Sequence, residues 1–197
     1  MRTRSGSEVV NHDRRRLLST GAISIATAGA AISVVFAVSG GTAISAQDKY
    51  TVQVPNGLAF SEFRGFEDWQ TVAVSQAGDL IEVILANSVM IDAYRAGVPG
   101  NGTRFPDGSK VAKIEWTSKK STESPYFVMV PDTLKSVSFI EKDSKRFRDS
   151  DGWGYAQFLY DAASDTFTPT GSDAACGYAC HTGVKAKDYI FTAYPRR

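Results

Sequence analysis

The chain has 197 residues, of which 43% are hydrophobic and 22% charged, and its formal net charge is +1. This length predicts one domain, or one domain with an appendage, and the composition excludes a mainly disordered or collagen-like chain. A charge so close to zero argues against a strongly basic nucleic-acid-binding protein. Two cysteines and two histidines are too few for a disulfide-rich scaffold or for a protein with several zinc sites.

Residues 1–46 differ from the rest of the chain. They begin with basic residues, including Arg14, Arg15 and Arg16, and continue with an uncharged run of small and apolar residues. This pattern is typical of an export signal cleaved near residue 46, and the arginines fit a loose twin-arginine motif. Because the uncharged run is long enough to span a bilayer, an uncleaved membrane anchor is the alternative. We therefore expect a periplasmic or otherwise exported bacterial protein.

Removing the signal leaves residues 47–197 as one domain with 17 basic and 19 acidic residues. In its first half, short apolar segments alternate with turn residues. The expected elements are a strand at 50–54, a helical turn or short helix at 60–69, a strand at 69–75, an ambiguous helix or buried strand at 80–86, a helix at 88–96 capped by Asn87, and a loop at 97–108.

The second half of the domain is richer in strand patterns. The expected elements are strands at 111–116, 126–130, 136–142 and 153–160, one or two helical turns at 143–150, a polar loop at 161–172 and a final apolar run at 189–194. Short strands in succession favour an antiparallel sheet or an open barrel. Together with the few helices, they predict an α+β fold.

The segment that carries the chemistry is Cys176-Gly177-Tyr178-Ala179-Cys180-His181. It holds both cysteines and, once the signal is removed, the only histidine. Two thiols followed directly by an imidazole are typical of covalent haem c attachment, with the usual spacing C-x-x-C-H. Here three residues separate the cysteines. Gly177 can accommodate the extra residue in a bulge, and residues four apart also share one side of a helical turn.

From these residues alone, other interpretations stay open. An exported, haem-free module can instead join Cys176 to Cys180 in a disulfide. A zinc site would have no evident fourth Cys or His ligand, and a thioredoxin-like pair would need two residues between the cysteines. Because residues 47–197 contain no second histidine, bis-histidine ligation of a haem is excluded and an open iron is expected. Met90 and Met129 are the methionine candidates for a sixth ligand, although a core position is commoner for methionine.

Three stretches, residues 84–116, 137–158 and 176–194, resemble the cytochrome P-460 family in sequence and order. The resemblance implies a largely antiparallel, open barrel-like sheet with a few helices around one covalently bound haem c, a fold shared with the beta-type cytochromes c′. It also implies thioether bonds from Cys176 and Cys180 and proximal ligation of the haem iron by His181. Most members of the family have two residues between the cysteines, whereas this chain has three.

The resemblance also implies candidate residues for the distal side of the haem. In the founding members a strand lysine is bonded to the haem and the enzyme oxidises hydroxylamine. The c′-beta relatives lack this bond and bind nitric oxide or carbon monoxide in a Phe-lined pocket. Lys113 lies in the strand where the bonded lysine is expected; Lys110 is the weaker candidate, and a solvated strand lysine is the alternative. Phe139 is the candidate for the distal wall, with a core position as the alternative.

The sequence thus predicts an exported cytochrome with one covalent haem c per chain and an open distal site for small nitrogen species, such as hydroxylamine or nitric oxide. A haem-dependent oxidoreductase and a non-enzymatic gas-binding or electron-transfer cytochrome are both open interpretations. The expected partners are a small-molecule ligand or substrate, a soluble redox protein and a second copy in a homodimer. No nucleic acid is expected, and a membrane is expected only where the N-terminal segment stays uncleaved.

Overall fold

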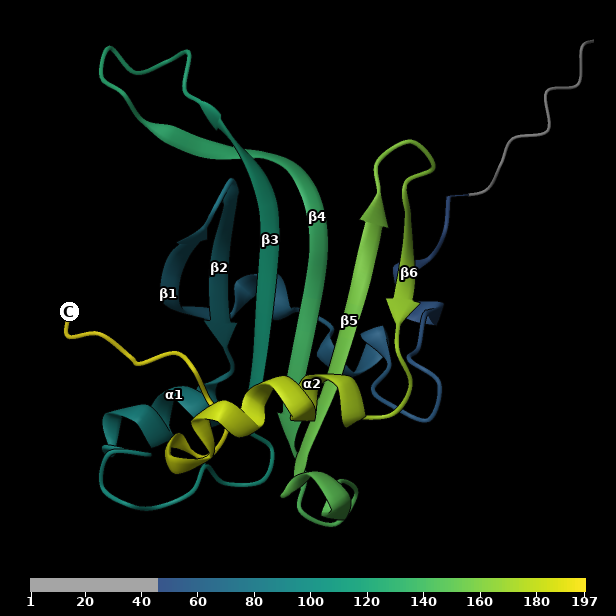
Figure 1. The fold of residues 1–197 in the computed structure, drawn as a ribbon, viewed down its shortest axis with the longest axis vertical. Helices are drawn as coiled ribbons and strands as arrows, with labels where there is room; N and C mark the ends of the chain where they lie inside the picture. Colours follow the sequence, from purple (N-terminus) through teal and green to yellow (C-terminus); the bar gives the residue numbers. More distant parts are fainter. Residues whose placement is uncertain (1–45) are drawn as a thin grey trace, which may run out of the picture. The chain divides into compact units, whose positions relative to one another are not determined.

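The computed structural model describes residues 46–197, which form a six-stranded antiparallel sheet with short helices (Figure 1). Neighbours in sequence are neighbours in the sheet, so the strand order is β1-β2-β3-β4-β5-β6 and the sheet is open. This confirms the predicted α+β class with a mainly antiparallel sheet. The strands are β1 (Gln70–Ala77), β2 (Leu80–Ala86), β3 (Lys110–Lys120), β4 (Met129–Lys142), β5 (Trp153–Asp161) and β6 (Thr166–Thr170).

The helices are short and begin or end at recognisable residues. In α1 (Ser88–Arg95), the Asn87 side chain accepts a hydrogen bond from the Met90 amide, and Gly97, with a φ of 92°, follows the helix end. α2 (Ala175–His181) crosses one face of the sheet (Figure 1). The 3-10 helices are η1 (Lys49–Thr51), η2 (Phe60–Phe63), η3 (Phe66–Asp68), η4 (Arg148–Ser150) and η5 (Thr182–Lys187).

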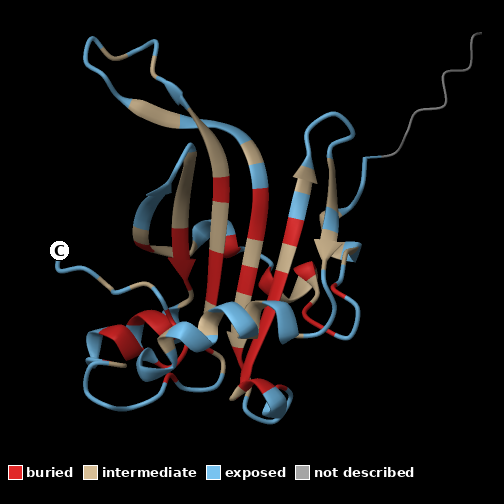
Figure 2. Ribbon diagram, viewed as in Figure 1, coloured by how far each residue is buried: buried red, intermediate tan, exposed pale blue. Residues whose placement is uncertain are grey.

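Alternation of side chains along the strands gives the sheet two different faces. On one face, Ala112, Phe139 and Phe158 pack with the phenylalanines of η2 and η3 in an aromatic cluster. On the other face, a second cluster includes Ile84 and Val111 together with side chains of α1. Buried residues gather in the lower half of the strands as drawn in Figure 2. The part of this second face near α2 holds the cavities described below.

The prediction of a strand at residues 50–54 is wrong. The segment begins as η1, because Asp48 accepts a hydrogen bond from the Tyr50 amide at 3.0 Å. Only a single bridge, Gln53 to Ala59, is formed there. The turn at 55–57 folds the chain back so soon that a ladder has no room to extend. The adjacent prediction of helical turns over 60–69 is confirmed by η2 and η3.

Two predictions for the second half of the domain are also wrong, one about where a strand begins and one about a loop. The segments 126–130 and 136–142 were predicted as separate strands, but β4 is continuous from Met129, and Tyr126 and Phe127 lie in the tip of the β3–β4 hairpin. The polar loop predicted at 161–172 contains β6, which pairs with β5 at the sheet edge. Its threonines suit a strand, and an edge strand tolerates Pro169.

The predicted export signal, residues 1–46, lies outside the described residues except for its last residue. Its cleavage, and the boundary of the predicted domain at 47, stay predictions. Within residues 46–197, every helix is too short or too polar to cross a membrane.

Candidate functional site

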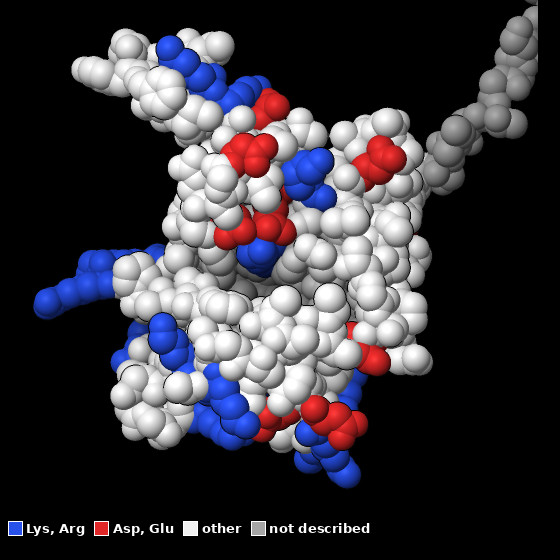
Figure 3. All heavy atoms as spheres, viewed as in Figure 1, with Lys and Arg blue, Asp and Glu red and all other residues white. Residues whose placement is uncertain are grey.

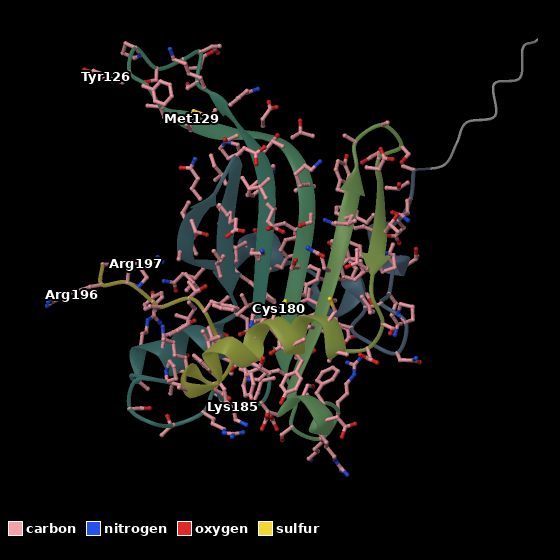
Figure 4. The ribbon with its side chains drawn as sticks, in the orientation of Figure 1. Tyr126, Met129, Cys180, Lys185, Arg196 and Arg197 are labelled. Atoms are coloured by element: carbon pink, nitrogen blue, oxygen red, sulfur yellow. The ribbon has the colours of Figure 1, made fainter. Side chains whose placement is uncertain are left out.

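Helix α2 carries all three residues of the predicted haem-binding motif. Cys176 and Cys180 lie four residues apart in the helix, so their thiols project from the same side, and both are free and exposed. Cys180 lies on the side of α2 that faces the sheet (Figure 4). His181 is the last residue of the helix. The three-residue spacing is therefore accommodated by a turn of regular α-helix.

Gly177 has a different role from the one predicted. It lies inside the continuous helix rather than in a bulge. A Cβ at this position would lie less than 3.0 Å from Cβ, Cγ and Cδ1 of Tyr155 on β5. Such a separation is essentially never found for real side chains. Glycine at 177 is thus what allows α2 to pack this closely against the sheet.

The imidazole of His181 is held in one orientation. Its Nδ1 lies 2.6 Å from the backbone oxygen of Tyr189, which can only accept, so Nδ1 carries the proton and donates. The rings of Tyr155 and Phe191 each lie 4.8 Å from the imidazole, centroid to centroid. In the described residues, Nε2 makes no hydrogen bond. His181 therefore presents a free nitrogen lone pair on Nε2, which is the form that ligates metals.

The electrostatics of the site favour the neutral imidazole. Burial lowers the pKa of His181, and the positive charge of Lys113 lowers it further, against the opposing effect of the hydrogen bond to Tyr189. A depressed pKa keeps the ring uncharged near neutral pH. The lone pair that ligation requires is then available without loss of a proton.

Two adjoining cavities lie between α2 and the sheet. Their volumes are about 560 and 240 Å³, and both are lined by Lys113, Cys180 and His181. Figure 3 shows the surface hollowed here, with charged side chains at the edge of the hollow. Cys176 and Gly177 line the smaller cavity. The apolar side chains that line the larger one are Ala73, Ile84, Val111, Ile140, Ile190 and Phe191.

Lys113 is the cationic side chain of these cavity walls. Its ammonium lies 2.8 Å from Glu115 and 3.4 Å from Glu82. Burial opposes the charge on Lys113, but hydrogen bonds and charges from Glu115 and Glu82 outweigh it and raise the pKa of the lysine. Ser136 and Ser75 in turn donate hydrogen bonds to Glu115 and Glu82, respectively. Lys113 thus stands as an ammonium ion tied to two carboxylates.

The weaker lysine candidate lies elsewhere. The ammonium of Lys110 donates a hydrogen bond to the Glu62 backbone oxygen at 2.9 Å and forms an ion pair with Glu141 at 3.1 Å. It also lies over the ring of Phe63. These partners belong to the aromatic face of the sheet. Lys110 is therefore not brought together with His181.

Phe139 does not form a wall of the haem site with its ring, as its role as distal-wall candidate would require, but lies in the core, which was the alternative. Phe139 is among the residues that line both cavities, but its ring is fully buried in the aromatic cluster on the opposite face and stacks on Phe63 at 4.1 Å. Met90 is a residue of α1 and is buried in the core, and Met129 lies at the far end of the β3–β4 hairpin (Figure 4). Neither methionine lines the cavities formed by the described residues.

Several residues of the site were not predicted. The backbone oxygen of Tyr189 and the rings of Tyr155 and Phe191 give no sequence signal, because each reaches His181 only through the tertiary fold. Glu115 did carry a signal, since it follows Lys113 at i+2 in a strand and must share its face. Glu82 joins them through the β2–β3 register, in which it pairs with Glu115.

The residues around the cavities fit a haem. Two thiols one helical turn apart, an adjoining neutral imidazole with a free Nε2 and a mainly apolar space supply the donors and the environment that such a cofactor requires. Residues 63–192 match the family model described as cytochrome P460. No curated protein matches the chain. Because the family match spans well over half of the 197 residues, the chain belongs to the cytochrome P460 family and is a haem-binding cytochrome.

Proposed function

We propose that the domain holds one haem c covalently through Cys176 and Cys180, with His181 as the proximal iron ligand. The single observation that carries the proposal is the hydrogen bond from His181 Nδ1 to Tyr189. It leaves Nε2 free beside the cavity that Cys180 also lines. A histidine in a merely packed position has no need of a free ring nitrogen beside two thiols. Both cysteines line the smaller cavity, so both thiols are in position to bond a haem there.

The proposed activity is binding or oxidation of a small nitrogen compound, such as nitric oxide or hydroxylamine. A haem in this site would supply an iron with an open coordination position for such a compound. The walls of the larger cavity support a small compound of this kind, because they are mainly apolar and Lys113 offers one charged hydrogen-bond donor. His181 is the one histidine that lines the two cavities formed by residues 46–197, and no methionine lines them.

Lys113 is proposed to act as a hydrogen-bond donor toward the ligand. The family resemblance also makes it a candidate for a covalent bond to the haem. Such a bond requires a neutral amine, and the ion pairs with Glu115 and Glu82 oppose deprotonation. We therefore favour the unbonded ammonium. Export to the periplasm, a soluble redox partner and a homodimer stay part of the proposal.

The function is tested with the full chain matured in a host that attaches haem c. We expect a coloured protein whose haem survives acid–acetone extraction, and a spectrum that changes when nitric oxide is added. Turnover of hydroxylamine with an artificial electron acceptor separates the enzyme from the gas-binding or electron-transfer cytochrome. A colourless chain whose mass is that of the protein less two protons would contradict the proposal and support the disulfide.

A further inference from the structure

The chain makes an unusual turn directly after η5. Asp188 and Tyr189 both have left-handed backbone conformations, with φ of 48° and 65°. Neither is glycine, and a bulky residue such as tyrosine rarely adopts this conformation. Two such residues in succession persist only where the surroundings hold them in place. The question is therefore what holds this turn.

The carboxylate of Asp188 is tied to three other segments. Asp188 as a whole is 6% exposed. Its carboxylate accepts hydrogen bonds from the Phe105 amide at 2.9 Å and from the indole of Trp153 at 3.3 Å. The third donor is the ammonium of Lys142, at 3.2 Å. These donors come from the loop before β3, from β5 and from β4. The side chain of Asp188 thus fixes the turn to the end of the sheet.

Lys142 is equally buried, at 4% exposed. Its ammonium also donates to the backbone oxygen of Asp151 at 2.9 Å and lies 4.7 Å from the centre of the Trp153 ring. Two charges removed from water in this way are tolerated only with such full pairing. The pair lies outside the cavity walls, so neither residue can contact a molecule bound there.

What this turn positions is the carbonyl group of Tyr189. Its oxygen accepts the hydrogen bond from Nδ1 of His181. We propose that the buried pair Lys142–Asp188 is a positioning device for the proximal histidine. The ion pair holds the turn in place, and the turn fixes the position of the Tyr189 oxygen. That oxygen keeps the proton of His181 on Nδ1, so that Nε2 stays unprotonated and free to bind a metal. A hydrogen bond at the remote nitrogen also makes the ring a stronger ligand.

The inference rests on the proposed function only for its effect on the haem, because the tautomer of His181 is a property of the haem-free chain as well. The test variant is Lys142→Met with Asp188→Asn, which removes both charges and leaves no unpaired one. The matched control is Lys119→Met with Asp132→Asn, which removes an ion pair of 2.7 Å on the β3–β4 hairpin.

The first measurement is long-range ¹H–¹⁵N NMR of the imidazole in the haem-free protein. We expect the Nδ1-protonated tautomer in the unaltered chain and in the control, and a mixture of tautomers in the test variant. An unchanged tautomer in a folded test variant would overturn the inference. If circular dichroism shows that this variant does not fold, Trp153→Phe decides the matter. It removes one donor to Asp188 and leaves the ion pair, and we expect a smaller change in the same direction; no change overturns the inference.

The second measurement uses the haem-loaded protein. A weaker ligand should raise the reduction potential and lower the frequency of the iron–histidine stretch in the test variant, but in neither the control nor Lys142→Arg, which keeps the charge. A merely structural pair would lower stability without moving these two quantities, and that result would refute the proposal. A chain that takes up no haem but shows the tautomer change would refute the proposed function and leave the positioning role standing.

Discussion

Replacing Gly177 with alanine tests how closely α2 must approach the sheet. The added Cβ would meet Cβ and Cγ of Tyr155, which cannot swing away as a side-chain end could. Overpacking of this kind costs about 1–3 kcal/mol, whereas alanine favours a helix over glycine by about 1 kcal/mol. Because the contact involves atoms next to the backbone, we take the upper part of the range. The expected net loss is about 2 kcal/mol, or about thirtyfold in the folding equilibrium.

The assay is urea unfolding of the haem-free domain, followed by circular dichroism. With a slope of about 2 kcal/mol per molar urea, the midpoint should fall by about 1 M. The control is Gly183→Ala, because a Cβ there meets nothing within 4 Å. That change should be neutral or stabilise by about 0.4–1 kcal/mol. Equal midpoints for Gly177→Ala and Gly183→Ala would refute the packing role of Gly177.

Three further predictions concern charge and ligation. Hydrogen bonds from Tyr189 and Tyr178 hold the pKa of Asp151 in the folded protein below its ordinary value of 3.8. These hydrogen bonds therefore stabilise the fold at higher pH, and this stabilisation is lost as the pH falls through the pKa that Asp151 has in the folded protein. Between about pH 5 and pH 2, the unfolding free energy should therefore fall more steeply for the unaltered chain than for Asp151→Asn; parallel curves would contradict this. The ferrous Soret band should lack a strong red shift, and Lys113→Ala should leave its position unchanged; a red-shifted band that Lys113→Ala removes would show a bond between Lys113 and the haem. His181→Ala should abolish proximal ligation and alter the spectrum of the haem-loaded protein, and an unaltered spectrum would contradict the role of His181.

The motif residues were predictable because they are contiguous. Cys176, Cys180 and His181 lie within six residues, so any helical turn brings them together. What the sequence did not reveal is how the histidine is oriented, since Tyr189 reaches it through two left-handed residues that no local pattern predicts. The face of Phe139 depends on register, and a strand presents its alternate residues to opposite faces.

The fold was predictable where the pattern is strong over many residues. Alternation and turn signals predicted β1, β5 and the antiparallel arrangement, and Asn87 with Gly97 marked the ends of α1. The failures lie where local pattern and tertiary pairing disagree. The alternating residues 50–54 find no partner strand, whereas the polar residues of β6 pair because β5 offers them its free edge.

The most direct test of the central claim is denaturing mass spectrometry of the full chain matured in a host that attaches haem c. The account predicts one haem retained per chain after denaturation, located by proteolysis on the peptide that contains Cys176 and Cys180. The haem should be lost in the double variant Cys176→Ala, Cys180→Ala. A chain without retained haem, or haem retained by the double variant, would contradict the claim.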